Sequence, residues 1–103
     1  MILEFSDEAE NDLEQIADYI AWDNPRRALS FVRELRSKCK DLADNPNGFA
    51  LVPRYEHHGI RRRVHGNYLI FYRVENAKVI IIHVLHGATD YGAILFGEFN
   101  GLI

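Results

Sequence analysis

The clearest hydrophobic pattern lies between Tyr68 and Leu85, where two apolar runs are separated by a polar turn. Tyr68 to Val74 is rich in aromatic and β-branched residues, which favour a pleated, half-buried strand. Val79 to Leu85 is apolar at both odd and even positions, so we expect it to be the most completely covered strand of the sheet. Gly66-Asn67 and Glu75 to Lys78 carry turn-forming residues, and they predict two hairpins.

The first half of the chain changes from a strand period to a helical period. Ile2 to Phe5 predicts a short first strand, and Ser6 is a suitable N-cap for a helix from Asp7 to about Trp22. The apolar positions of this helix form one continuous stripe: Ala9, Leu13, Ile16, Ala17, Ile20 and Ala21. A second helix begins at Pro25 and ends before Asn45-Pro46, and the short connection makes the two helices antiparallel neighbours.

The remaining segments complete the fold prediction. Val52 to Arg54 permits only an edge strand, because Pro53 has no backbone N–H to donate. Ile60 to Val64 predicts a basic strand that begins the meander, and Tyr91 to Phe99 predicts a short helix after it. The order predicts an α+β fold: an N-terminal strand, an antiparallel helical hairpin, and an antiparallel meander of three to four strands with the helices on one face.

Length and composition limit what surrounds this sheet. At 103 residues we expect a single domain over residues 1–103. The one cysteine, Cys39, excludes an internal disulfide, and its helical apolar pattern favours a buried side chain over a nucleophile. No apolar run approaches the roughly 18 residues of a membrane span. Because Met1 to Phe5 also lacks the features of a signal peptide, we expect no membrane partner and a cytoplasmic location.

The net charge of −3 hides a division along the chain. Residues 1–24 hold eight acidic and no basic side chains, whereas residues 25–74 carry a net charge of +7. We therefore expect one acidic and one basic surface region. The basic region contains a run of three arginines, in which Arg61 and Arg63 share one face of the strand and Arg62 takes the other. This run is either a charged strand surface that resists aggregation or a partner-binding patch.

Histidines and aromatic residues suggest two further sites, and both have simpler explanations. His57-His58 and the pair His83/His86 lack a Cys or carboxylate cluster, and strand alternation places His83 and His86 on opposite faces, so we expect no metal and no cofactor. Either His83 or His86 beside an arginine is a candidate general base for a ribonuclease, although surface histidines are commoner. Three aromatic residues suit base stacking or the core, and we expect the core: Tyr68, Phe71 and Tyr72.

Three motifs follow one another along this architecture. They are Ala21-Trp-Asp-Asn-Pro-Arg-Arg-Ala28, Gly66-Asn-Tyr-Leu-Ile-Phe-Tyr-Arg73 and Val84-Leu-His-Gly-Ala-Thr-Asp90. In this order and spacing the chain resembles the RelE/ParE superfamily of bacterial toxins, and within it the ParE branch, from about Ser6 to about Asp90. The resemblance implies the toxin of a type II toxin–antitoxin pair. Such a toxin is held inactive in a hetero-oligomer by a cognate antitoxin, for which we expect an acidic, partly disordered segment.

The resemblance implies one of two targets, because RelE-like members cut messenger RNA in the ribosome whereas characterised ParE-like members poison DNA gyrase. RNA cleavage needs positioned basic side chains that stabilise the charge on the phosphate. Where the RelE-type motif has arginines, this chain has Leu69 and Thr89, and the region of its catalytic tyrosine holds Ile94-Leu-Phe96. We therefore expect a gyrase inhibitor with no catalytic residues, and DNA gyrase as its target.

Two alternatives remain open: a RelE-like ribosome-dependent mRNA endonuclease and a non-toxic, antitoxin-binding homologue. For the ribonuclease, the candidate catalytic residues are Arg62, Arg63 and His86. For the gyrase inhibitor, the antitoxin- or target-binding residues are the arginines of the basic region: Arg54, Arg61, Arg62, Arg63 and Arg73.

Overall fold

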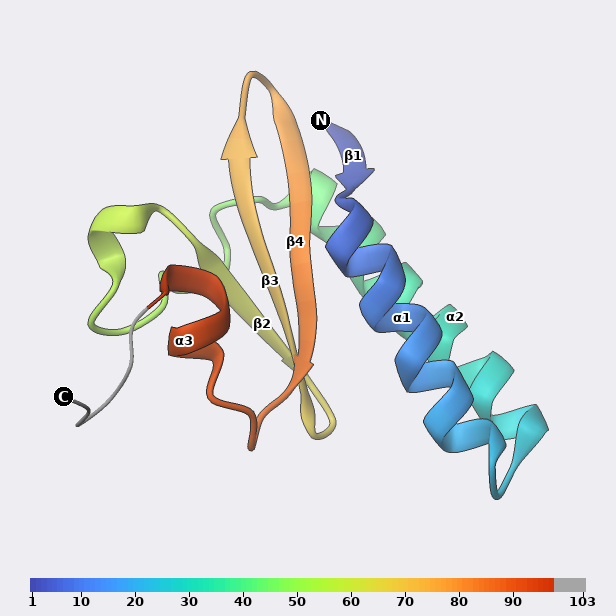
Figure 1. The fold of residues 1–103 in the computed structure, drawn as a ribbon. Helices are drawn as coiled ribbons and strands as arrows, with labels where there is room; N and C mark the ends of the chain where they lie inside the picture. The colour runs from blue at the N-terminus through green and yellow to red at the C-terminus, as the bar shows by residue number, and fades with distance from the viewer. Residues whose placement is uncertain (98–103) are drawn as a thin grey trace, which may run out of the picture.

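The computed structural model describes residues 1–97, in which a helical hairpin lies along one face of a four-stranded sheet (Figure 1). The elements are β1 (Ile2–Phe5), α1 (Asp7–Ala21), α2 (Pro25–Asp44), the 3₁₀ helix η1 (Glu56–His58), β2 (Arg61–His65), β3 (Tyr68–Glu75), β4 (Lys78–His86) and α3 (Tyr91–Phe96). This order confirms the predicted α+β fold. The predicted end of the last helix, at Phe99, lies outside the described residues. None of the helices within residues 1–97 is long and apolar enough to cross a membrane.

The sheet has the order β1-β4-β3-β2 and combines two kinds of pairing. β2, β3 and β4 form the predicted antiparallel meander, whereas β1 runs parallel to β4 and pairs only with Lys78 to Ile81. The segment around Val52 is not the edge strand that the sequence permitted, since Leu51 forms one isolated bridge with Arg61. Pro53 cannot donate to a ladder, so the pairing does not extend beyond this bridge.

Both helices of the hairpin begin where the sequence places their caps. The hydroxyl of Ser6 accepts a hydrogen bond from the Ala9 N–H at 3.0 Å and donates to the Ile82 carbonyl at 2.8 Å. The Asn24 side chain accepts from the Arg27 N–H at 3.1 Å. Each cap satisfies an N–H that the helix itself leaves unpaired, and Ser6 also ties the start of α1 to β4.

Two apolar clusters lie on opposite faces of the sheet. The larger one, the hairpin core, joins α1 and α2 to the sheet: Ala9, Leu13, Ile16, Phe31, Leu35, Cys39, Leu42, Ile70, Tyr72, Val79, Ile81 and Val84. The smaller one, the α3 core, contains Val52, Ile60, Leu69 and Phe71, with side chains of α3 packed against it. Cys39 is fully buried as expected, and this burial raises the pKa of its thiol to about 12.

The longest run of buried residues lies in β3, although Val79–Leu85, the segment predicted to be the most completely covered, has no exposed residue. Leu69 to Tyr72 are four consecutive buried residues, whereas buried and partly exposed positions mix along β4. β3 is covered because it lies between two strands with a core on each face, while β1 pairs with only part of β4. A register shift between Phe71 and Tyr72 also leaves Ile82 as an extra residue in β4, a β-bulge.

Candidate interaction surfaces

The three consecutive arginines of β2 divide between the two faces of the sheet, as predicted. Arg61 and Arg63 stand opposite residues of β3 that face the hairpin, whereas Arg62 stands opposite Phe71, which faces α3. Directly opposed residues of an antiparallel pair share a face. The run therefore does not form one continuous basic patch.

Arg61 and Arg63 tie β2 to the end of α2 and to the segment that follows it. The Arg61 guanidinium donates to the Phe49 carbonyl at 2.6 Å, and that of Arg63 donates to the Lys38 carbonyl at 3.1 Å. Arg63 also lies 4.8 Å from the centre of the Phe49 ring and 3.8 Å from a carboxylate oxygen of Asp41. Both side chains thus hold a segment of the chain in place, through charge-assisted hydrogen bonds and a cation–π contact.

Arg73 directly follows Tyr72, the last residue of β3 that pairs with β2. Its Nε donates to the Glu75 carboxylate at 2.8 Å, and the two side chains are 45% and 49% exposed. An ion pair this exposed contributes little to stability. Arg73 is accessible to a partner, but Glu75 already neutralises part of its charge.

Arg62 and Arg54 meet at a hollow on the α3 face of the sheet. The Arg62 guanidinium donates to the Tyr91 hydroxyl at 3.0 Å, and both residues line a hollow of about 310 Å³. Arg54 and Thr89 line the same hollow. Arg54 is exposed, and its φ of 76° is a left-handed conformation that residues with a side chain rarely adopt.

The three candidate catalytic residues of the ribonuclease alternative are not brought together. Arg62 and Arg63 lie on opposite faces of the sheet. His86 ends β4 opposite Tyr68, and its Nδ1 accepts a hydrogen bond from the Ala88 N–H at 3.0 Å. A single phosphate therefore does not contact all three side chains in this arrangement.

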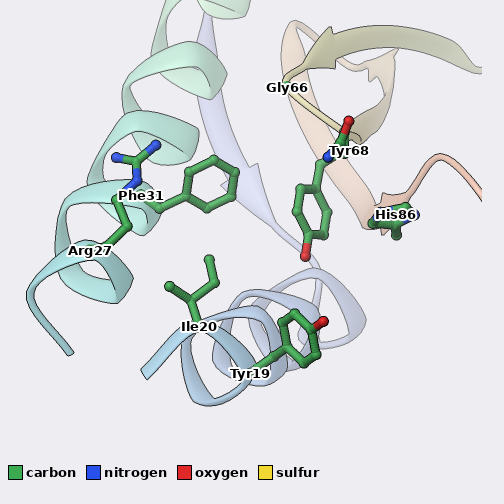
Figure 2. A pocket seen from close by; sticks show the side chains of 8 residues that line it. Tyr19, Ile20, Arg27, Phe31, Gly66, Tyr68 and His86 are labelled. Carbon is green, nitrogen blue, oxygen red and sulfur yellow. The ribbon is translucent and has the colours of Figure 1, made fainter. Parts of the chain in front are cut away.

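A larger hollow, of about 620 Å³, lies where the tip of the helical hairpin meets the end of the sheet (Figure 2). Tyr68 extends from β3 toward Tyr19 and Ile20 of α1, and Phe31 faces it from α2. The ring centres of Phe31 and Tyr68 are 5.5 Å apart. These side chains give the hollow an aromatic lining, which suits an apolar group of a partner better than a charged one.

Tyr68 differs from the two other aromatic residues for which we predicted the core. Phe71 and Tyr72 are fully buried, and the Tyr72 hydroxyl donates to the Pro46 carbonyl at 2.7 Å. Tyr68 packs against the hairpin core but is only partly buried, so it forms a wall of the large hollow. Burial, and to a lesser extent Tyr19, raises the pKa of Tyr68.

Arg27 supplies a cation at the rim of the large hollow, and Glu34 neutralises it. The two nitrogens of the Arg27 guanidinium contact both carboxylate oxygens of Glu34, the longer contact being 3.4 Å. Glu34 also lies 3.2 Å from Nε2 of His65. The hydrogen bond from Arg27, followed by the one from His65, lowers the pKa of Glu34 below its usual value. The rim therefore adds little net charge.

Sequence reasoning missed a contact between Asp12 and the part of β4 that β1 leaves without a partner. Asp12 Oδ2 accepts from the Val84 N–H at 2.9 Å and lies 2.7 Å from Nδ1 of His83. The acidic side chains of residues 1–24 predicted a surface region, but Asp12 lies on the apolar side of α1, between Ala9 and Ile16. The position of Asp12 within the apolar stripe could have indicated that its side chain faces the sheet.

His83 and His86 stand on opposite faces of the sheet, as predicted. They pair with Phe71, which faces α3, and with Tyr68, which packs against the hairpin core. Both nevertheless line one hollow of about 390 Å³, together with Asp12, at the edge of β4 beyond its pairing with β1. Within residues 1–97, no three His, Cys, Asp or Glu side chains are grouped as the ligands of a metal ion.

The fold and the motifs of the chain match known toxins. The family model for the ParE toxin of the type II toxin–antitoxin system parDE matches residues 3–91. The chain therefore belongs to the ParE toxin family of type II toxin–antitoxin systems. A search of curated proteins gives no match.

Among solved structures, the chromosomal ParDE system from P. aeruginosa is similar with a TM-score of 0.74 and 25% identity over 84% of this chain and 95% of that chain. The toxin–antitoxin complex RelBE2 from Mycobacterium tuberculosis is similar with a TM-score of 0.58 and 23% identity, over 85% of this chain and 92% of that one. The RelB–RelE complex from Methanococcus jannaschii gives a TM-score of 0.54 and 19% identity, over 85% and 94%. The last two share the fold.

Proposed function

We propose that the chain inhibits DNA gyrase by binding it, and that a cognate antitoxin neutralises the chain through an acidic, partly disordered segment. The toxin–antitoxin hetero-oligomer forms in the cytoplasm, and residues 1–103 act as one toxin domain. Membership of the ParE family supports this proposal over the ribonuclease. Gyrase inhibition needs a binding surface, whereas RNA cleavage needs several charged groups held around one phosphate.

The main support for the proposal is the identity of the side chains at the positions where RNA cleavage requires arginine. Leu69 is an apolar residue of the α3 core, only 8% exposed, and it cannot supply a positive charge. Thr89 is neutral and lines the small hollow beside Arg62. The nearest available cations do not compensate, because Arg62 and Arg63 lie on opposite faces of the sheet.

A supercoiling assay with purified gyrase tests the proposal. We expect the chain to inhibit supercoiling or to trap gyrase on cut DNA, and the addition of the antitoxin to reverse this effect. The same preparation is added to translating ribosomes, where messenger RNA should stay intact. Thr89→Arg should not create a nuclease, since groups that act together contribute far less singly.

Three results separate the candidate functions. Cleavage of messenger RNA in the ribosomal A site, abolished by changing Arg62, Arg63 or His86, would replace the gyrase proposal by the RelE-like activity. An absence of both activities in a chain that still binds the antitoxin would identify the non-toxic homologue. Inhibition of gyrase without RNA cleavage supports the proposal.

A further inference from the structure

Within residues 1–97, three of the five arginines that we expected to contact a partner form no ion pair, and two of these three line one hollow. Arg63 lies near Asp41 and Arg73 pairs with Glu75, but within residues 1–97 neither Arg54 nor Arg62 has a carboxylate at ion-pair distance. Arg61 also forms no ion pair there, but its guanidinium is held by a backbone carbonyl. Arg54 and Arg62 line one hollow together. Two like charges around one hollow favour the binding of an anion between them.

The walls of this hollow are held in position by close contacts. The Tyr91 hydroxyl accepts from Arg62 at 3.0 Å and can donate its own hydrogen in turn. A Cβ at residue 92 would lie 2.8 Å from the Tyr55 hydroxyl, so Gly92 allows α3 to approach this tyrosine. The Tyr55 ring stacks on Phe96 with centroids 4.0 Å apart. The segment that carries Arg54 and the helix α3 therefore form a fixed cleft above Arg62.

The backbone at Arg54 gives an independent reason to assign a role to this hollow. Its φ of 76° is unfavourable for a residue with a Cβ, and glycine would adopt it without strain. Strained residues of this kind concentrate at binding and catalytic sites. Here the strained residue is Arg54, which lines the same hollow as Arg62.

The surroundings favour a carboxylate over a nucleic-acid backbone. A nucleic-acid site needs a tract of cations along the phosphates, whereas here Glu56 lies between the two arginines in the sequence and the chain as a whole carries −3. Asp90 lines the hollow itself, and its carboxylate accepts from the Ala93 N–H at 3.3 Å. A guanidinium fork fits a single carboxylate with two parallel hydrogen bonds.

We propose that this hollow binds one carboxylate of an acidic peptide segment, with Arg54 and Arg62 as its ligands and Tyr91 as a third donor. The inference rests on the proposed function, because the acidic segment of the antitoxin is the source of that carboxylate. Arg61 and Arg63 then support the fold rather than the partner. Arg73 is left outside the site.

A titration with a hexaglutamate peptide tests this site, followed by the side-chain ¹H–¹⁵N NMR signals of the arginines. We expect the peptide to shift the signals of Arg54 and Arg62 and to leave that of Arg73 in place. Arg54→Gln and Arg62→Gln should each weaken binding about tenfold, the loss expected for a charge-assisted hydrogen bond. Arg73→Gln is the matched control, since it removes the same charge from an exposed side chain and should change binding less than twofold.

The Arg54→Gln variant should fold like the parent, because the Arg54 side chain is exposed and its replacement disturbs no buried contact. Weaker binding by this variant therefore reports on the site and not on folding. Arg62→Lys separates charge from geometry: it should bind more weakly than the parent, since an ammonium cannot form the two parallel hydrogen bonds. An equal loss with Arg73→Gln, or no shift at Arg54 and Arg62, would overturn the assignment. Tighter binding of an octathymidine oligonucleotide than of hexaglutamate would overturn it as well.

The gyrase assay of the same variants keeps the two proposals apart. If the chain binds hexaglutamate through Arg54 and Arg62 but leaves gyrase active, the carboxylate site is supported and the proposed function is wrong. If the chain inhibits gyrase but the peptide does not shift the signals of these arginines, the proposed function is supported and the carboxylate site is wrong.

Discussion

The two faces of the sheet are built in different ways. Among residues 1–97, twelve buried residues from two helices and two strands form one cluster on the hairpin face, whereas four form the α3 core. The hairpin face is closed by long helices whose N-caps are satisfied. The α3 face is closed by an irregular segment and a helix of six residues, and the small hollow with its two arginines opens there.

This difference indicates a division of roles between stability and binding. The large cluster stabilises the fold, because the free energy of burial scales with the apolar area removed from water. The smaller cluster mainly positions the groups at its edge, such as Arg62 and Tyr91. Segments with few buried contacts open more readily than a core, so a binding face formed from them can adjust to a partner.

The largest effect should follow from a cavity in the hairpin core. Ile81→Ala removes a fully buried side chain, and we expect a loss of about 2–5 kcal/mol in the free energy of unfolding. Leu95→Ala, in the partly buried layer of α3, should cost about half as much or less. Urea denaturation measures both values. Equal losses would contradict the contrast between the two faces.

A second prediction concerns the contact that closes the α3 face. Gly92→Ala places a methyl group 2.8 Å from the Tyr55 hydroxyl, and the stacking of Tyr55 on Phe96 limits how far this ring can move. We expect a loss of about 1–3 kcal/mol, as for other overpacked sites. Adding Tyr55→Phe removes the crowded oxygen and should recover part of that loss. If the double variant is as unstable as the sum of the two single variants, the contact does not limit the packing.

The contrast between the faces also explains what the sequence could predict. The hairpin face follows from regular periods, since Leu13, Ile16 and Leu35 recur at helical spacing and cap residues precede both helices. Alternation along β2 correctly separated Arg62 from its two neighbours. These features depend on local spacing alone, and spacing can be read from one sequence.

The features that the sequence did not predict depend on long-range pairing. The bulge at Ile82 arises where β4 meets β3, and it shifts the alternation of β4, so that Val84 rather than His83 joins Val79 and Ile81 in the hairpin core. Asp12 can accept a hydrogen bond from the free edge of β4 only because β1 is short and runs parallel to β4. The hollow between Arg54 and Arg62 likewise requires α3 to pack over the loop that carries Arg54. No local pattern encodes these contacts.

A third prediction tests whether Asp12 closes the sheet edge. Asp12→Ala leaves the Val84 N–H without its acceptor, and because the Asp12 side chain is only 13% exposed we expect a loss of about 1–3 kcal/mol in the free energy of unfolding. Asp12→Asn keeps an oxygen acceptor of the same shape and should cost less. Amide hydrogen exchange should show faster exchange at Val84 in the alanine variant. Unchanged exchange there would mean that Asp12 does not protect this edge.

The smallest effect should come from the ion pair beside the large hollow, where the Glu34 carboxylate is held by Arg27 and His65. Its pKa in the folded chain is lower than in the unfolded chain, so the unfolded chain binds the proton more readily at acid pH. The stabilising contribution is therefore complete above the ordinary pKa of 4.5 and is lost as the pH falls through the lowered value. Glu34→Gln should lose less stability than the parent between pH 6 and pH 3, as measured by urea denaturation. Arg27→Gln removes the main cause of the pKa shift, so this variant should also lose less stability than the parent between pH 6 and pH 3. If both variants lose as much stability as the parent over this range, the exposed pair does not contribute.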